Sequence, residues 1–454
     1  MSKEQLFSQF QPVSTKHWKQ QIQFDLKGAD YNGTLVWESP EGIKVKPFYN
    51  SDDVQNIDLQ QVVIKSGFQI LQNIYVHDVS KSNNRAFDTL NRGAESICFT
   101  IPNQQISIDE LMQNLPTKAS YYFKLHFLST EFNSKLNQLA TKNQYHFYIL
   151  NDPIYQLTSD GNWFENQDKD FEKLNIIVSN SAVSCISVNG TQYQNAGANV
   201  VQQLAYILSH CNEYFNHISK LNQNITIEIA VGTNYFFEIA KIRALRMLFN
   251  SLAKKFDHNL ECHIIATPTK RNKTIYDYNT NLLRTTTECM AAILGGADAI
   301  SNVAYDNLYH KDNEFGDRIA RNQLLILKEE SYFDKVSNPA DGTYYIESLT
   351  NQLAEKALIL FKEIESKGGF LAQLLKGNIQ KKIVESAKKE QELFDLGKEV
   401  LIGTNKHPNK NDKMKNDLEL YPFVKHNPRK TTIVPIIESR LAEKTEQERL
   451  KLEK

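Results

Sequence analysis

The sequence lacks the features that mark secreted, membrane and disulfide-stabilised proteins. Its 454 residues contain five cysteines, and no two of them form a Cys-x-x-Cys pair, so neither a disulfide framework nor a zinc site is expected. No apolar run approaches the roughly 18 residues that a membrane-spanning helix needs. Residues 1–11 lack the apolar core of a signal peptide. We therefore expect a cytoplasmic protein that has no membrane partner and carries free, buried thiols.

An excess of charge of one sign is also missing. Lys and Arg total 52 and Asp and Glu total 53, which gives a formal net charge of −1. Such balance provides no overall field that would attract nucleic acid or an anionic membrane. The histidines show no spacing typical of metal ligands, so we predict no metal site. Function must therefore be sought in local motifs.

Short apolar, β-rich runs alternate with helical segments from about residue 65 onwards. The expected strands are Ser96–Ile101, Tyr121–Leu128, Tyr145–Leu150, Ser184–Val188, Ile225–Val231, Leu260–Ala266 and Ala299–Ala304. The expected helices between and after them include Tyr235–Phe256, Thr285–Leu294 and Asp317–Lys328. Alternating strands and helices predict βαβ units and a parallel sheet. Seven or eight such units favour a closed (β/α)8 TIM barrel over a doubly wound sheet.

The chain divides into three predicted parts. Residues 1–64 form an N-terminal arm, residues 65–403 the α/β barrel, and residues 404–454 a C-terminal linker and helix. The last part of the barrel region, Leu349–Leu401, reads as a long helical stretch that is broken at Gly368–Gly369. A polar loop rich in Asn and Lys follows it, and the sequence ends in a charged helix.

The most specific motif runs from Asp277 to Glu330. It reads DYNTNLLRTTTECMAAILGGADAISNVAYD and, after a spacer, FGDRIARNQLLILKEE. This order resembles the barrel domain of the adenosylcobalamin-dependent acyl-CoA mutases, and above all the methylmalonyl-CoA mutase family. The matching positions are Arg284, Thr285, Glu288, Met290, Gly295, Gly296 and Arg318 through Asn322. The resemblance implies a (β/α)8 barrel.

Other segments resemble the same family in the same order, so the likeness covers most of the chain. They are Trp18–Gly28, similar to the arm of small subunits, and Asn83–Gly93, Gln194–Tyr206, Pro339–Leu349 and Leu401–Pro408 in the barrel region. Each match is short, but together they identify the chain as similar to the small (beta) subunit type.

Two residues depart from the family at the position of its chemistry. Catalytic chains carry a Tyr-His pair in a Gly-Tyr-His-x-Gln-x-Ala-Gly motif, whose His donates to the migrating thioester carbonyl. Here Thr191 and Gln192 occupy those positions. A Gln amide donates hydrogen bonds but does not titrate as an imidazole does. The resemblance therefore implies that this chain has no catalytic residues of its own.

Two further family features are missing. The Asn151-Asp152 pair is followed by PIYQLTSDGNW, which lacks the Arg of catalytic chains. The Asp-x-His-x-x-Gly motif of the cobalamin-binding domain, whose His ligates cobalt in the family, does not occur in the sequence. The resemblance thus implies that adenosylcobalamin belongs to a partner subunit and that this chain alone binds none.

Arg284 is the one candidate substrate-binding residue in the long motif. An arginine grips phosphates and carboxylates through paired hydrogen bonds, so it could contact an acyl-CoA. The alternative is an ion pair at the barrel rim with Glu288, which lies four residues further on. Gly295 and Gly296 are interpreted as the C-terminal cap of a helix that ends at Leu294.

The function expected from these observations is that of a small, non-catalytic subunit of a heterodimeric methylmalonyl-CoA mutase, inactive by itself. Its partner would be a larger homologous subunit, and the complex would interconvert methylmalonyl-CoA and succinyl-CoA. Two alternatives stay open. The chain could be the substrate-binding barrel of a split acyl-CoA mutase with cobalamin on a separate chain, or a stand-alone CoA-binding protein.

Overall fold

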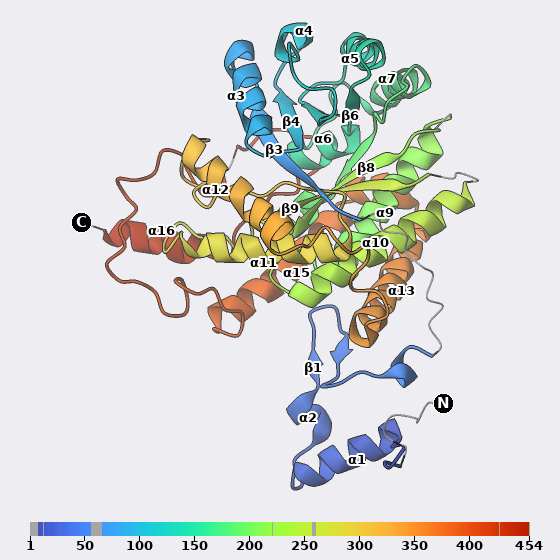
Figure 1. Cartoon of the computed structure of the whole chain (residues 1–454), viewed down its shortest axis with the longest axis vertical. Helices are drawn as coiled ribbons and strands as arrows, with labels where there is room; N and C mark the ends of the chain where they lie inside the picture. The colour runs from blue at the N-terminus through green and yellow to red at the C-terminus, as the bar shows by residue number, and fades with distance from the viewer. Residues whose placement is uncertain are drawn as a thin grey trace, which may run out of the picture.

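The centre of the molecule is a closed barrel of parallel strands (Figure 1). The structure, a computed structural model, describes residues 8–11, 13–55, 66–219, 221–256, 260–425 and 427–453. The barrel strands are β3 (Gln69–Tyr75), β4 (Ser96–Ile101), β5 (Ser120–Leu125), β6 (His146–Leu150), β7 (Ser187–Asn189), β8 (Ile225–Val231), β9 (Cys262–Pro268) and β10 (Ala299–Ile300). They are hydrogen-bonded in the order β6-β5-β4-β3-β10-β9-β8-β7. This confirms the predicted (β/α)8 fold.

The ring closes at a narrow seam between β6 and β7. A single bridge joins the two strands there, from Tyr148 to Ser184. Two backbone hydrogen bonds support it: the N–H of Ile149 donates to the carbonyl of Ser184 at 2.8 Å, and the N–H of Ser187 donates to that of Asn151 at 3.0 Å. The neighbouring strand pairs in the ring share longer ladders.

The predicted strands agree with the structure to different degrees. The bounds of β4 and β8 are those predicted, because both are nearly continuous apolar runs that are buried on both sides. The strand β3 was not predicted, and β10 spans two residues in place of the six expected. The predicted strand Tyr121–Leu128 corresponds to β5, which begins one residue earlier and ends at Leu125, and its Tyr122 lies inside the barrel.

Helices surround the barrel and begin at side-chain caps, as polar residues before an apolar helical run predict. Asp78, Ser129, Asp152 and Asn199 each accept a hydrogen bond from the first turn of the following helix. The helices of this layer are α3 (Val79–Asn91), α4 (Ile108–Leu111), α5 (Thr130–Asn143), α6 (Pro153–Asp160), α7 (Gln167–Ser179), α8 (Thr191–Asn195), α9 (Val200–His217), α10 (Tyr235–Lys255), α11 (Thr280–Gly295) and α12 (Glu314–Leu325). Gly296 caps α11 with a φ of 88°, as predicted, whereas Gly295, predicted to belong to the cap, is the last residue of the helix.

The N-terminal arm projects from the barrel at the bottom of Figure 1. It contains α1 (Thr15–Asp25), α2 (Tyr31–Leu35), a two-stranded hairpin of β1 (Trp37–Glu38) and β2 (Lys44–Val45), and a turn of 3-10 helix at Ser51–Asp53. No described residue of α1 is buried. The predicted boundary between residues 64 and 65 lies outside the described residues.

The C-terminal region folds back onto the barrel. After a short π-helical turn at Ile326–Glu330, it contains α13 (Tyr344–Ser366), α14 (Gly369–Leu375), α15 (Asn378–Asp395) and α16 (Glu443–Leu452). The predicted break at Gly368–Gly369 is confirmed, since both residues have positive φ between α13 and α14. None of the helices within the described ranges is both long and apolar enough to cross a bilayer.

Candidate functional site

Aromatic rings fill the inside of the barrel. The rings of Tyr122 and Tyr148 stack with centroids 4.7 Å apart, and the imidazole of His263 lies 4.5 Å from Tyr148. The hydroxyl of Tyr122 is also hydrogen-bonded to Nε2 of His263 at 2.8 Å. We call these three residues the interior stack. It occupies the volume inside the strands with close-packed rings, as cores do.

An ion pair lies close to the interior stack, and its lysine follows Tyr122 by two residues on β5. Nζ of Lys124 on β5 donates to Oε2 of Glu228 on β8 at 2.8 Å. Burial alone would lower the pKa of Lys124, but the nearby carboxylate of Glu228 raises it above its ordinary value. The lysine is therefore held charged and paired, and it links β5 to β8 across the inside of the barrel, past β6 and β7.

The two positions that replace the family's Tyr-His pair lie in α8, directly after β7, and point into protein. The hydroxyl of Thr191 donates to the side chain of Asn189. Gln192 is 2% exposed. Its Nε2 donates to the carbonyl of Ile436 at 2.8 Å and of Thr158 at 3.2 Å, and its Oε1 accepts from the Thr158 hydroxyl at 2.8 Å. The amide is thus fully used by protein groups.

A backbone segment covers the end of the barrel where the C-terminal ends of the strands lie. We call residues 427–442 the strap. Its N–H groups donate to four carbonyls in the segments that follow three barrel strands, β6, β7 and β9: Ile433 to Gly161 at 3.1 Å, Ile436 to Thr158 at 2.8 Å, Ser439 to Asn195 at 3.1 Å and Leu441 to Arg271 at 2.9 Å. Active sites of TIM barrels lie at this C-terminal face. The strap therefore occupies the place where a substrate would approach the barrel.

The Asn151-Asp152 pair anchors the loop after β6. Oδ1 of Asp152 accepts from the hydroxyl of Tyr214 at 2.6 Å and from Nε2 of His210 at 2.9 Å, and Oδ2 accepts from the N–H of Asn189 at 2.7 Å. Burial alone would raise the pKa of Asp152, but the hydrogen bonds and charge of His210 hold it below the ordinary value. This network is buried and ties the loops after β6 and β7 together.

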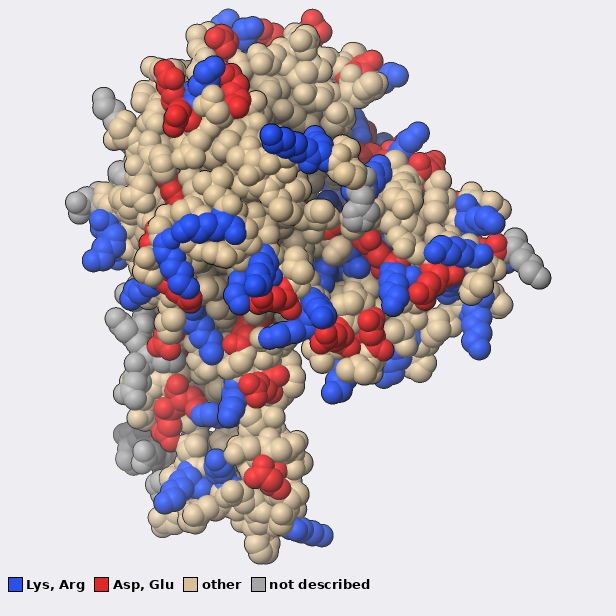
Figure 2. All heavy atoms as spheres, turned by 180° about the vertical axis from the view of Figure 1, so that it is seen from behind, with Lys and Arg blue, Asp and Glu red and all other residues tan. Residues whose placement is uncertain are grey.

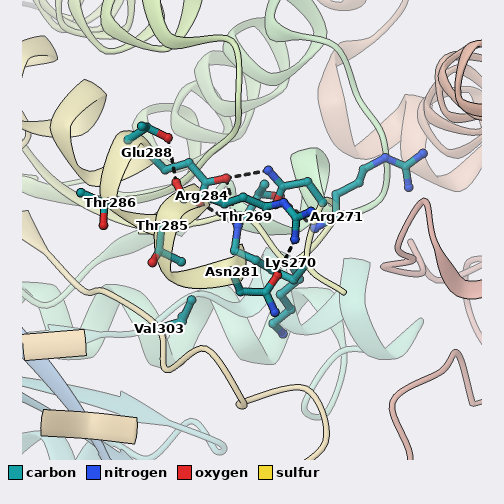
Figure 3. Close-up of polar contacts among 12 residues, drawn as sticks. Thr269, Lys270, Arg271, Asn281, Arg284, Thr285, Thr286, Glu288 and Val303 are labelled. Atoms are coloured by element: carbon teal, nitrogen blue, oxygen red, sulfur yellow. Dashed lines mark hydrogen bonds and ion pairs between the residues drawn. The ribbon is translucent and has the colours of Figure 1, made fainter. Parts of the chain in front are cut away.

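Arg284 lies among the residues that follow β9, as Figure 3 shows. Its Nη1 donates to Oδ1 of Asn281 at 2.8 Å and to the hydroxyl of Thr274 at 3.0 Å, and its Nη2 donates to the carbonyl of Ile402 at 2.7 Å. These contacts connect α11 to the segment after α15. A substrate contact by Arg284 remains a prediction.

The alternative for Arg284, an ion pair with Glu288, is wrong. Glu288 is 1% exposed and pairs instead with Nζ of Lys273 at 2.7 Å, while Nδ2 of Asn272 donates to its Oε1 at 2.6 Å. Burial raises the pKa of Glu288 and lowers that of Lys273. Glu288 is therefore paired with a lysine from the loop after β9, and not with Arg284 as the helical spacing suggested.

The C-terminal face of the barrel is covered, and the inside of the barrel is filled. The strap is hydrogen-bonded across the face, and the interior stack fills the barrel behind it. Within the described part of the chain, no group of three or more His, Cys, Asp or Glu side chains is placed to hold a metal ion. All five cysteines are buried and free, as predicted.

The fold and this face define a (β/α)8 barrel protein whose C-terminal end is closed by its own chain. Residues 129–453 match the family described as Methylmalonyl-CoA mutase. The chain is 32% identical over 446 residues to a methylmalonyl-CoA mutase small subunit from Porphyromonas gingivalis, with 90% of this chain and 72% of that protein covered. It is 28% identical over 453 residues to a methylmalonyl-CoA mutase from Rhizobium meliloti, with 83% and 62% covered.

The chain belongs to the methylmalonyl-CoA mutase family. A further relative, a methylmalonyl-CoA mutase from Cereibacter sphaeroides, is 36% identical over 235 residues, which are 49% of this chain and 33% of that protein. The chain therefore spans less than two-thirds of the length of several curated relatives that it matches.

The structure places Thr191 and Gln192 in α8, after β7, and Arg284 in α11, after β9. Neither the strap nor the contacts of the interior stack were predicted from the sequence. All three residues of the interior stack lie within predicted strands, but their contacts with one another were not predicted. The strap left no signal, because it contacts residues far away in sequence.

Proposed function

We propose that this chain is the small, non-catalytic subunit of a heterodimeric methylmalonyl-CoA mutase. A larger homologous subunit carries the catalytic residues and adenosylcobalamin, and the complex interconverts methylmalonyl-CoA and succinyl-CoA in the cytoplasm. This chain completes and stabilises that subunit and has no turnover alone. Residues 65–403 are the barrel that does this, residues 1–64 the arm, and residues 404–454 the closing tail.

The observation that carries the proposal is the state of Gln192. A catalytic group must be free to donate to the reacting carbonyl as charge develops on it. The amide of Gln192 is instead committed to the backbone of Thr158 and Ile436. The interior stack supports the same conclusion, because it leaves the inside of the barrel packed.

The arm offers a surface for the larger subunit. Trp18 is 55% exposed and Phe24 is 78% exposed, both on α1. Exposed aromatic residues of this kind are typical of interfaces. Figure 2 shows the arm from behind as a protrusion on which uncharged surface lies between Lys or Arg and Asp or Glu side chains. We expect an obligate pair to bury about 2,000 Å² or more.

The test is reconstitution with the larger homologue. We would express this chain alone, the larger homologue alone, and both together, and assay mutase activity with added adenosylcobalamin. We expect the two chains to co-purify as a stable heterodimer and only preparations that contain the larger chain to turn over. Restoring the family's residues in this chain, by Thr191→Tyr with Gln192→His, should not create activity.

Two outcomes would overturn the proposal. Turnover by this chain with only a small cobalamin-binding protein would favour a split mutase whose substrate barrel is this chain. Failure to associate with the larger homologue would favour a stand-alone protein that binds CoA.

A further inference from the structure

A cavity lies beside the C-terminal face of the barrel, next to the strap. It has a volume of about 540 Å³ and is enclosed by the N-terminal arm, the loops after β7, β8 and β9, and helix α15. Cavities of this size hold small ligands. Neither the interior stack nor Thr191 and Gln192 line it. It is therefore separate from the positions of the family's chemistry.

The floor of the cavity is a rigid polar network. Nζ of Lys241 donates to Oε1 of Gln194 at 2.9 Å, to Oε1 of Gln203 at 3.0 Å and to the carbonyl of Ala230 at 2.7 Å, and it pairs with Glu238. The three donors of this ammonium are thereby satisfied. The floor is built before any ligand arrives, so binding there would not have to order it.

Most charges on the walls are also paired within the protein. Arg271 pairs with Glu390, and Lys382 pairs with Glu385 at 2.8 Å. Lys389 is exposed to solvent on α15. Two carboxylates that line the cavity have no ion pair among the described residues, those of Glu41 and Glu399. With Lys241 included, five acidic and four basic side chains surround the cavity, so the acidic groups outnumber the basic ones by one.

Glu41 is the clearest of these groups, because one of its oxygens lacks a donor. Its Oε1 accepts from the N–H of Val200, in the first turn of α9, at 3.2 Å. Its Oε2 is buried and has no hydrogen-bond partner within the described part of the chain. Burial raises the pKa of Glu41. An unsatisfied buried carboxylate oxygen costs free energy, which a bound donor would recover.

Glu399 supplies a second carboxylate, and Trp37 an aromatic wall. Burial and the neighbouring Glu390 raise the pKa of Glu399, as expected for a carboxylate without a cation nearby. Trp37 is 49% exposed at the arm's edge of the cavity. An indole attracts ammonium and guanidinium groups through its ring face.

We propose that this cavity binds a small organic cation, whose ammonium or guanidinium group donates to Glu41 and whose charge is balanced by Glu41 and Glu399. The site joins three parts of the chain: the arm contributes Glu41 and Trp37, the barrel contributes the polar floor, and the segment after α15 contributes Glu399. This inference is independent of the proposed function, because it concerns a ligand that this chain binds without its partner.

The test is calorimetric titration of the full chain with putrescine and agmatine, with succinate as an anion of the same carbon length as putrescine. We expect saturable heat with one or both amines at millimolar or lower concentration and none with succinate. Glu41→Gln keeps an acceptor for Val200, and Glu399→Gln keeps the side-chain shape. We expect each to weaken amine binding by about tenfold or more, because an ionised acceptor is lost.

Glu392→Gln is the matched control, because Glu392 is exposed on α15 and does not line the cavity. It should bind amines as the unchanged chain does. Circular dichroism and urea unfolding establish that each variant is folded, and Glu399→Gln carries the test if Glu41→Gln is not. The proposal is overturned if neither amine gives saturable heat, if succinate binds equally well, or if Glu399→Gln and Glu392→Gln bind alike.

Discussion

Replacing Gln192 with leucine removes the amide that ties the strap to the barrel. The side chain is of similar size and buried, so the main effect is the loss of three hydrogen bonds to Thr158 and Ile436. Two acceptor carbonyls and one hydroxyl then lose a buried partner. A buried polar group without a partner costs about 1–3 kcal/mol, and some of this is relieved by the other contacts of these groups. We expect a loss of about 2–4 kcal/mol in the free energy of unfolding.

The assay is urea unfolding followed by circular dichroism, together with hydrogen exchange of the strap. The backbone N–H of Ile436 should exchange faster in Gln192→Leu, because its segment is held less firmly. Gln138→Leu, at an exposed position on α5, serves as the control and should change stability by less than about 0.5 kcal/mol. If Gln192→Leu is as stable as that control and its strap exchanges no faster, Gln192 does not hold the strap.

Three further outcomes are expected. Burial and the nearby Glu213 raise the pKa of Glu365 from 4.5 to about 7. The contribution of Glu365 to the free energy of unfolding is therefore most favourable below pH 4.5 and is lost as the pH rises through 7. Glu365→Gln should therefore be more stable than the unchanged chain above pH 7, by about 1 kcal/mol after allowance for solvent screening, and equal stability at pH 8 would contradict this. Gly161→Ala should lower the urea midpoint, because a Cβ there would lie 2.8 Å from the carbonyl of Ile433 and the φ of 87° disfavours alanine; an unchanged midpoint would mean that the strap shifts freely. The five buried thiols should resist alkylation in the folded chain and react in urea, as mass spectrometry would show, and rapid labelling of the folded chain would contradict their burial.

The fold was predictable where burial is continuous and local. β4 and β8 are mostly apolar and almost entirely buried along their length, so composition agrees with their bounds. β3 was missed because Gln69 and Asn73 interrupt its apolar pattern. In the structure, their amides donate to hydroxyls elsewhere in the barrel: Gln69 donates to Ser120 of β5 at 3.0 Å, and Asn73 donates to Ser301, directly after β10, at 2.8 Å. A closed barrel can satisfy such groups, but a local pattern does not reveal it.

The contacts of the candidate site residues could not be predicted from the sequence. Motif order identified Thr191 and Gln192, which the structure places in α8 directly after β7. The partner of Gln192, Ile436, lies 244 positions further along the chain, and spacing carries no information at that range. The expected pair of Arg284 with Glu288 failed for a related reason. Helical spacing shows which side chains on one helix can contact each other. In the folded molecule, however, Glu288 forms its ion pair with Lys273 from the preceding loop.

The seam between β6 and β7 gives the strap a mechanical role. A barrel held at one place by a single bridge would open there first under thermal motion or force. The strap is hydrogen-bonded to Thr158 and Gly161, which follow β6, and to Asn195, which follows β7. The strap thus connects the segments that follow β6 and β7, the two strands joined by a single bridge. Because residues 427–442 come after all eight barrel strands in the sequence, this connection forms only once every strand has been synthesised.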